Sequence, residues 1–241
     1  MEVREWEKMV RENEGMSLSL AFPALMRKVY LWMTLALAIS GVTAYIVATS
    51  PGLLQMVYGN RWGIWALIIA EFILVWKISR GVWNPNRSLA ATTVMFAIFS
   101  ALNGATLSSI FALFAPAAII KTFMVTTATF AAKAAYGYFT RRDMTKMGGL
   151  LMMALIGLII AGVVNMFLHS SMLDMVVSGV GVLIFVGLTA WDSQQIKMQL
   201  AAAPDMGESS QKIALAGALS LYLDFVNLFL YLLRFLGGDR D

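Results

Sequence analysis

The stretch that decides the fold is residues 213–236, IALAGALSLYLDFVNLFLYLLRFL. A helix needs about 20 mostly apolar residues to cross a bilayer, so this stretch is long enough. Its polar residues recur at spacings of four, three, four and three, which places them on one helical face: Ser220, Asp224, Asn227, Tyr231 and Arg234. A helix surrounded by lipid would not carry such a face. We therefore expect this helix to be central, with its polar face toward other helices, either as a static hydrogen-bonded seam or as the lining of a pathway.

The composition is that of a membrane protein. Of the 241 residues, 59% are hydrophobic and 13% charged, whereas soluble domains have roughly 45–50% apolar and about 25% charged residues. This nearly excludes a water-soluble enzyme. With no cysteine and one histidine, thiol catalysis, a thiolate metal site and a multi-histidine zinc site are also excluded. The net charge of +4 is typical of lysine and arginine held on the cytosolic side, and we expect no nucleic-acid partner.

The chain contains seven candidate spans, separated by short loops with helix breakers. We therefore predict an all-α, polytopic membrane protein, although a count of six spans is open because the third and fourth meet at Ala115-Pro116. Residues 1–28 are predicted to form a cytosolic tail and residues 29–241 a single transmembrane domain. The predicted spans are residues 29–50, 62–79, 89–113, 117–139, 147–168, 173–191 and 213–236.

Lysine and arginine predict the orientation. With seven spans and a cytosolic N-terminus, 14 of the 18 basic residues lie inside and 4 outside. The C-terminus is then outside. Small residues suited to close helix contact include Gly157 on the fifth span and Gly181 and Gly187 on the sixth.

Three acidic residues stand out in or at the end of predicted spans: Glu71 in the middle of the second, Asp192 at the inner end of the sixth and Asp224 near the middle of the seventh. An Asp at the bilayer centre costs at least about 2.5–3.5 kcal/mol, so such groups usually face a polar interior. The hairpin between the last two spans allows Asp192 to meet Asp224, but counting residues from the loop places them at different depths. Two carboxylates about 4 Å apart repel by about 4 kcal/mol at an effective dielectric of ~20, so a close pair would share one proton. Losing that proton adds a negative charge, which favours separation of the two helices or binding of a hard cation.

Two segments carry a resemblance to a known family. Residues 185–197, FVGLTAWDSQQIK, resemble a signature ending in Tyr/Trp-Asp-x-x-x-Ile-Lys, and residues 218–229, ALSLYLDFVNLF, are closer still to a characteristic last helix. Weaker matches are Asn103-Gly104 and residues 141–145. The chain after about Tyr30 thus resembles the transmembrane Bax-inhibitor-motif family, and its compact size favours a bacterial, cytoplasmic-membrane member.

The resemblance implies a fold and a function. It implies seven helices wrapped with the last at the centre, and a hydrogen-bonded pair, Asp192 and Asp224, acting as a pH sensor. Bacterial members are described as pH-sensitive calcium leak channels, eukaryotic relatives as cell-death suppressors, and some bacterial members as modulators or substrates of a membrane-bound protease. The family also has an arginine beside the pair. Arg80 is the nearest candidate here, although no position matches cleanly, and Glu71 matches a family acidic position better.

We therefore expect a calcium leak gated by protonation of Asp192 and Asp224, with transient calcium contact at the pair and no cofactor. Support for the pathway or the pair is expected from Glu71, Arg80, Ser220, Asn227 and Tyr231. One alternative is a regulatory protein that binds a membrane protease or cell-death factor, with structural aspartates. A proton-coupled transporter is also open. An intramembrane aspartyl protease is disfavoured, because Asp224 follows Leu221-Tyr222-Leu223 rather than the glycines of the protease motif.

Overall fold

A computed structural model describes residues 3–81, 84, 87–140, 142–202 and 205–237, without the side chains of residues 3–20 and of Arg61. Some residues of the predicted loops lie outside the described ranges: the helix breakers Pro85, Asn86 and Pro204, and the basic residue Arg141. All regular elements within the described ranges are α-helices, which confirms the all-α fold class. The helices are α1 (Val3–Thr49), α2 (Pro51–Tyr58), α3 (Arg61–Gly81), α4 (Leu89–Leu107), α5 (Ile110–Leu113), α6 (Pro116–Phe139), α7 (Thr145–Leu168), α8 (Ser171–Ala201) and α9 (Glu208–Leu236).

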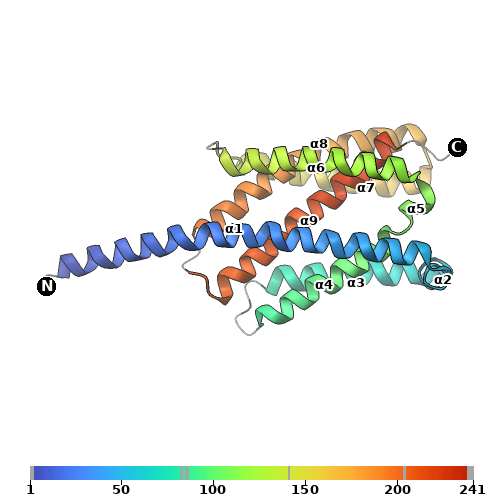
Figure 1. Ribbon diagram of the computed structural model, residues 1–241. Helices are drawn as coiled ribbons and strands as arrows, with labels where there is room; N and C mark the ends of the chain where they lie inside the picture. The colour runs from blue at the N-terminus through green and yellow to red at the C-terminus, as the bar shows by residue number, and fades with distance from the viewer. Residues whose placement is uncertain (1–2, 82–83, 85–86, 141, 203–204, 238–241) are drawn as a thin grey trace.

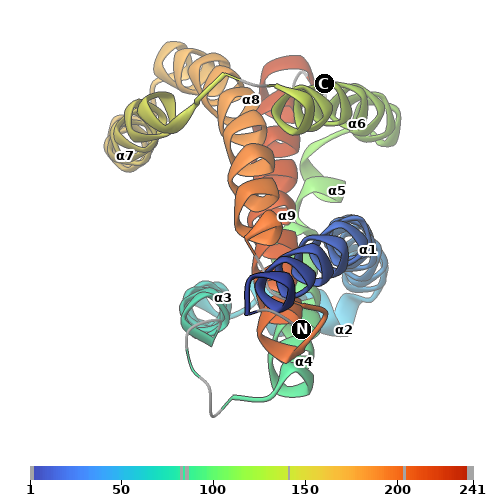
Figure 2. The ribbon, with the colours of Figure 1, turned by 90° about the vertical axis from the view of Figure 1, so that its left-hand side faces the viewer.

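The helices α8 and α9 form the centre of the bundle. Figure 2 shows them side by side, with α6 and α7 toward one end of the view and α1, α3 and α4 toward the other. Helix α9 packs against α8, α1, α6 and α4, whereas α7 packs mainly on α8. The most apolar window of α9 is 67% buried, and no other candidate span exceeds 39%. The last helix is therefore central, as predicted.

Six helical segments are long and apolar enough to cross a membrane. The predicted span 117–139 coincides with α6 but is not among them, since Lys121, Lys133 and several threonines lower its hydropathy. The fold therefore does not confirm the count of seven, nor the predicted orientation. The six are Ala21–Thr49, Trp62–Gly81, Leu89–Leu113, Thr145–Leu168, Ser171–Ala201 and Glu208–Leu236.

The first candidate span begins earlier in the chain than predicted. Helix α1 runs without a break through the predicted boundary between residues 28 and 29, and Figure 1 shows it as the longest helix, extending beyond the bundle at its N-terminal end. Leu25 and Met26 are already buried in the core. The apolar part of α1 therefore starts near Ala21.

Close helix contacts are made at some of the predicted glycines. A Cβ at Gly181 would lie 2.6 Å from the ring of Tyr231, and one at Gly187 would lie 2.9 Å from Leu151, so α8 packs closely at both positions. A Cβ at Gly157 would meet nothing within 4 Å. The prediction of a close contact at Gly157 was therefore wrong.

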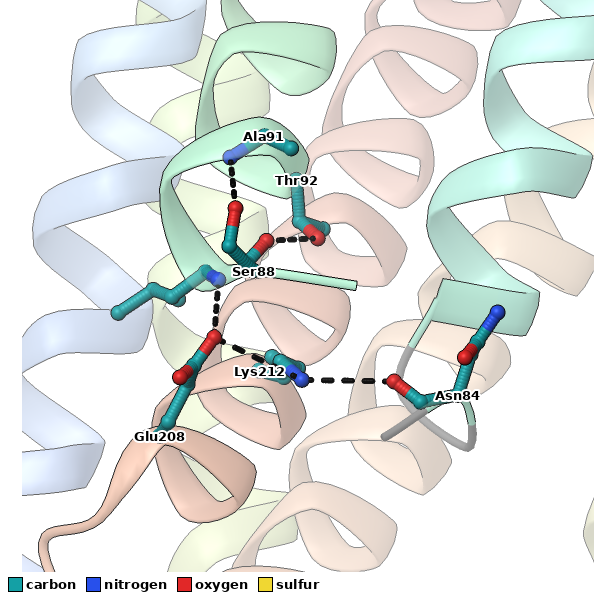
Figure 3. Close-up of polar contacts among 7 residues, drawn as sticks. Asn84, Ser88, Ala91, Thr92, Glu208 and Lys212 are labelled. Atoms are coloured by element: carbon teal, nitrogen blue, oxygen red, sulfur yellow. Dashed lines mark hydrogen bonds and ion pairs between the residues drawn. The ribbon is translucent and has the colours of Figure 1, made fainter. Parts of the chain in front are cut away.

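A polar cluster holds the first turn of α9 against the start of α4 (Figure 3). Glu208 accepts a hydrogen bond from the backbone N–H of Leu89, and its Oε1 lies 3.7 Å from Nζ of Lys212. The Lys212 side chain is only 5% exposed and also donates to the backbone carbonyl of Asn84 at 3.5 Å. These contacts fix where α9 begins, and therefore how deep Asp224 lies in the bundle.

Gly137 on α6 allows the closest approach between α6 and α8, and we predict that Gly137→Ala will lower the melting temperature. A methyl group there would lie 2.0 Å from the carbonyl oxygen of Ala190, and overpacking of this kind costs about 1–3 kcal/mol. The matched change Gly157→Ala should leave the melting temperature unchanged or raise it, since alanine favours a helix. Thermal unfolding of both variants in detergent is the measurement. Equal melting temperatures would contradict the close α6–α8 contact.

Candidate functional site

Asp192 on α8 and Asp224 on α9 face each other in the centre of the bundle. Their carboxyl groups are close enough to interact directly. Asp224 is only 5% exposed, and Asp192 is half-buried. Two carboxyl groups hydrogen-bond to each other only when one of them carries a proton. The arrangement is therefore suited to holding one proton between two oxygens.

The pair forms although the two aspartates lie at different distances from the connecting loop. Helix α8 continues to Ala201, and α9 begins only at Glu208. Figure 1 shows α9 running obliquely through the bundle. Counting residues from a common loop level therefore does not give the relative depth of the two aspartates.

Two cavities meet at Asp192, and Asp224 lines one of them. An inner cavity of about 300 Å³ lies between α7, α8 and α9, and four residues of the predicted polar face line it: Ser220, Asp224, Asn227 and Tyr231. A second cavity of about 430 Å³ is lined by polar residues that include Ser79, Gln195 and Gln199. Both cavities are lined by Asp192, Ser220, Trp191 and Met152. The polar face of α9 is thus a cavity wall.

Two buried polar atoms at the inner cavity have no hydrogen-bond partner within the described residues. They are Oδ2 of Asp224 and Nε1 of Trp191. Buried polar groups are normally paired with protein or water. A water molecule takes up about 30 Å³ in the liquid, so a cavity of this size has room for several. Neither atom is itself exposed to the cavity, so water there could pair with Trp191 or Asp224 only after a small side-chain movement.

Trp191 is positioned by α7. A Cβ at Gly148 would lie 2.1 Å from Cε2 of the indole, so only glycine leaves room for this ring. The indole therefore sits between the two cavities because α7 has a glycine opposite it. The sequence analysis treated Trp191 only as part of a motif and did not predict this contact. The signal for it is a large side chain on one span and a glycine on the neighbouring span.

No lysine or arginine lines either cavity among the residues whose side chains are described. Arg80, the predicted support for the pair, lies on the surface of α3 with its guanidinium 4.5 Å from the ring centroid of Trp76. Arg234, the last residue of the polar face, lies 3.6 Å from Asp174 and is more than half exposed. Neither arginine neutralises the aspartates.

Glu71 belongs to a separate polar network. Its carboxylate accepts hydrogen bonds from Thr106 at 2.6 Å and from Asn103 at 3.2 Å. Asn103 in turn accepts a hydrogen bond from the Tyr222 hydroxyl at 2.8 Å, and this hydroxyl lies 2.6 Å from that of Ser40. The network joins α1, α3, α4 and α9. Since Tyr222 and Asp224 are two residues apart on a helix, they point to nearly opposite sides of α9.

The aspartate pair is not a complete calcium site by itself. Calcium takes 6–8 oxygen ligands, and two carboxylates supply at most four. The described residues contain no group of three or more acidic, histidine or cysteine side chains placed to hold a metal. The pair therefore fits a passing cation that keeps part of its water shell better than a tightly bound one.

These features define a class: a helical, multi-pass membrane protein with an acidic pair at its centre. The chain matches the family model described as "Inhibitor of apoptosis-promoting Bax1" over residues 23–241, and it belongs to that family. The resemblance inferred from residues 185–197 and 218–229 is thereby confirmed.

Similar proteins occur in distant bacteria. The chain is 42% identical over 217 residues to the inner membrane protein YbhL of Escherichia coli, with 89% of this chain and 92% of that protein covered. It is 44% identical over 214 residues to an uncharacterised protein of Borreliella burgdorferi, covering 89% and 91%. It is also 35% identical to an uncharacterised membrane protein of Streptococcus pyogenes serotype M1, covering 88% and 91%. The alignments cover the helical domain almost completely in each case.

The Tyr222 hydroxyl donates to Asn103 and lies within hydrogen-bond distance of the Ser40 hydroxyl, and we predict that Tyr222→Phe will destabilise the bundle. Leaving a buried partner unsatisfied costs about 1–3 kcal/mol, which corresponds to a fall in melting temperature of roughly 2–10 °C for a chain of this size. Tyr231→Phe is the matched control, because the Tyr231 hydroxyl makes no hydrogen bond within the described residues. A melting temperature equal to that of the control would show that the network does not stabilise the fold.

Proposed function

We propose that this protein is a pH-sensitive calcium leak of the bacterial cytoplasmic membrane, gated by the proton shared between Asp192 and Asp224. The observation that carries the proposal is the position of this pair between two cavities, with one buried carboxylate oxygen unpaired. The family supports it, and YbhL is described as an inner membrane protein. Calcium and protons are the partners of this activity, and no chemical reaction is involved.

The proton controls the charge at the junction of the cavities. With one proton shared, the pair carries one negative charge and its two helices are joined by a hydrogen bond. Without it, two negative charges repel across a low-dielectric interior. No basic side chain described at the cavities offsets this change. A change in protonation therefore alters both the contact between α8 and α9 and the affinity for a divalent cation.

The polar residues of α9 provide the route on either side of the pair. Ser220 lines both cavities, while Asn227 and Tyr231 line the inner one. Glu71, on α3, belongs to the separate network of Tyr222 on the opposite side of α9. We propose that it attracts cations rather than contacting the pair. Arg80 has no part in this mechanism.

We predict calcium flux in liposomes that differs between pH 6 and pH 8 and that loses its pH dependence in Asp192→Asn and Asp224→Asn. Each variant removes the carboxyl group with which the other aspartate shares the proton. Asp143→Asn is the control, since Asp143 lies in the loop before α7, where its carboxylate accepts a hydrogen bond from the backbone of Thr145. The measurement is the rate of calcium release at several pH values.

Three results would overturn this proposal. Flux no greater than that of empty liposomes at any pH would favour a regulatory protein that binds a membrane protease or cell-death factor. An unchanged pH profile in both aspartate variants would be consistent with a calcium leak but would show that the aspartate pair does not gate it. Calcium movement driven uphill by a proton gradient would indicate a proton-coupled transporter instead.

We further propose seven spans, with α6 crossing the membrane and the N-terminus in the cytosol. The chain has no cysteine, so single cysteines report the topology directly. We predict that Ser88→Cys and Asp143→Cys will be labelled from the cytosolic side, and His169→Cys from the opposite side, by a membrane-impermeant maleimide. If α6 did not cross, Ser88→Cys and Asp143→Cys would be labelled from opposite sides.

A further inference from the structure

A large apolar groove separates α1 from α6. It has a volume of about 1030 Å³ and is distinct from the two cavities at the aspartate pair, with which it shares no lining residue. Its floor is apolar and buried, and includes Met33, Phe130 and Phe225. Figure 2 shows α1 and α6 on the same side of α9, whose Phe225 lines the groove between them.

The groove opens sideways, toward the space that lipid occupies. Several exposed residues along its two rims are small, among them Thr34 and Ala38 on α1 and Thr127 and Ala131 on α6. A Cβ at Gly41, also on this rim, would meet nothing within 4 Å. An apolar molecule in the bilayer can therefore move into the groove laterally without displacing a helix.

One end of the groove is aromatic and basic. Phe22 stacks on Tyr138 with ring centroids 6.3 Å apart and closes this end. Arg27 lines the groove, is exposed, and has no ion-pair partner within the described residues. Lys197 donates to the carbonyl of Tyr138 at 2.7 Å and lies over its ring. A guanidinium with no ion-pair partner among the described side chains, beside tyrosine rings and at the end of an apolar groove, matches a phosphate group attached to hydrocarbon.

The length of the groove suits an acyl chain. From Arg27 to Gly41 α1 advances about 21 Å, which exceeds the depth of one leaflet, about half of the 30 Å hydrocarbon core. Flexible hydrocarbon chains can fill a space of this length and irregular width.

We propose that this groove is a specific phospholipid site, with the lipid phosphate at Arg27 and an acyl chain along the groove between α1 and α6. The acyl chain would pack on Phe225, whose ring centroid lies 5.6 Å from that of Phe123 and 5.4 Å from that of Phe130. Because Phe225 follows Asp224 directly on α9, a lipid in the groove contacts the helix that carries the aspartate pair. The site does not depend on the proposed calcium leak.

The test is photolabelling in phosphatidylcholine vesicles that contain phosphatidylglycerol with a diazirine in its acyl chain, followed by peptide mapping. We expect labelling to concentrate on the groove residues of α1 and α6. Ala131→Trp, which fills the groove, should reduce it several-fold. The matched variant Ala132→Trp changes the adjacent exposed alanine, which does not line the groove, and should leave it unchanged. Melting temperatures of both variants check that each is folded.

The contribution of Arg27 is tested separately. Arg27→Gln should lower labelling roughly five-fold, because a basic side chain near an anionic headgroup contributes about 1 kcal/mol. Lys133→Gln is the control, since Lys133 is an exposed base on α6 that does not line the groove. Labelling spread evenly over all lipid-facing helices, or reduced equally by Ala131→Trp and Ala132→Trp in folded protein, would overturn the proposal. Equal labelling of Arg27→Gln and Lys133→Gln would overturn the assignment of the phosphate.

Discussion

The contact between two carboxyl groups on α8 and α9 is the interaction on which the proposed activity depends. An acidic pair inside a membrane protein is costly unless a proton, a base or water offsets the charge. Here the described surroundings offer no base, and the pair instead borders two cavities. In the proposed mechanism a shared proton keeps α8 and α9 together and makes their contact sensitive to pH.

Helix α9 carries two polar systems on opposite sides. Asp224 faces α8 and the cavities, whereas Tyr222 joins Ser40 and Asn103 toward α1 and α4. The second system is satisfied by hydrogen bonds between neutral groups and the Glu71 carboxylate, so it is suited to fixing the position of α9. The system around Asp224 retains an unpaired carboxylate oxygen and borders a cavity, and is therefore suited to a change in protonation or conformation.

Much of this arrangement follows from residue spacing, and the remainder depends on tertiary contacts. Ser220, Asp224, Asn227 and Tyr231 could be assigned to one wall because their spacing is that of a helix face. Tyr222 could not be separated from the aromatic residues that belong in any membrane helix, so its network was missed. Gly157 and Gly181 are alike in sequence, and only the position of Tyr231 distinguishes the packed glycine. The groove beside α1 was likewise not predictable, because α1 and α6 are apolar on most sides.

The shared proton is tested most directly by infrared difference spectroscopy of the protonated carboxyl group between pH 6 and pH 8. The central claim predicts a carbonyl band that changes over this range in the wild-type protein and in Glu71→Gln, and that is lost in Asp192→Asn and in Asp224→Asn. A band that persists in both aspartate variants, or that disappears only in Glu71→Gln, would contradict it.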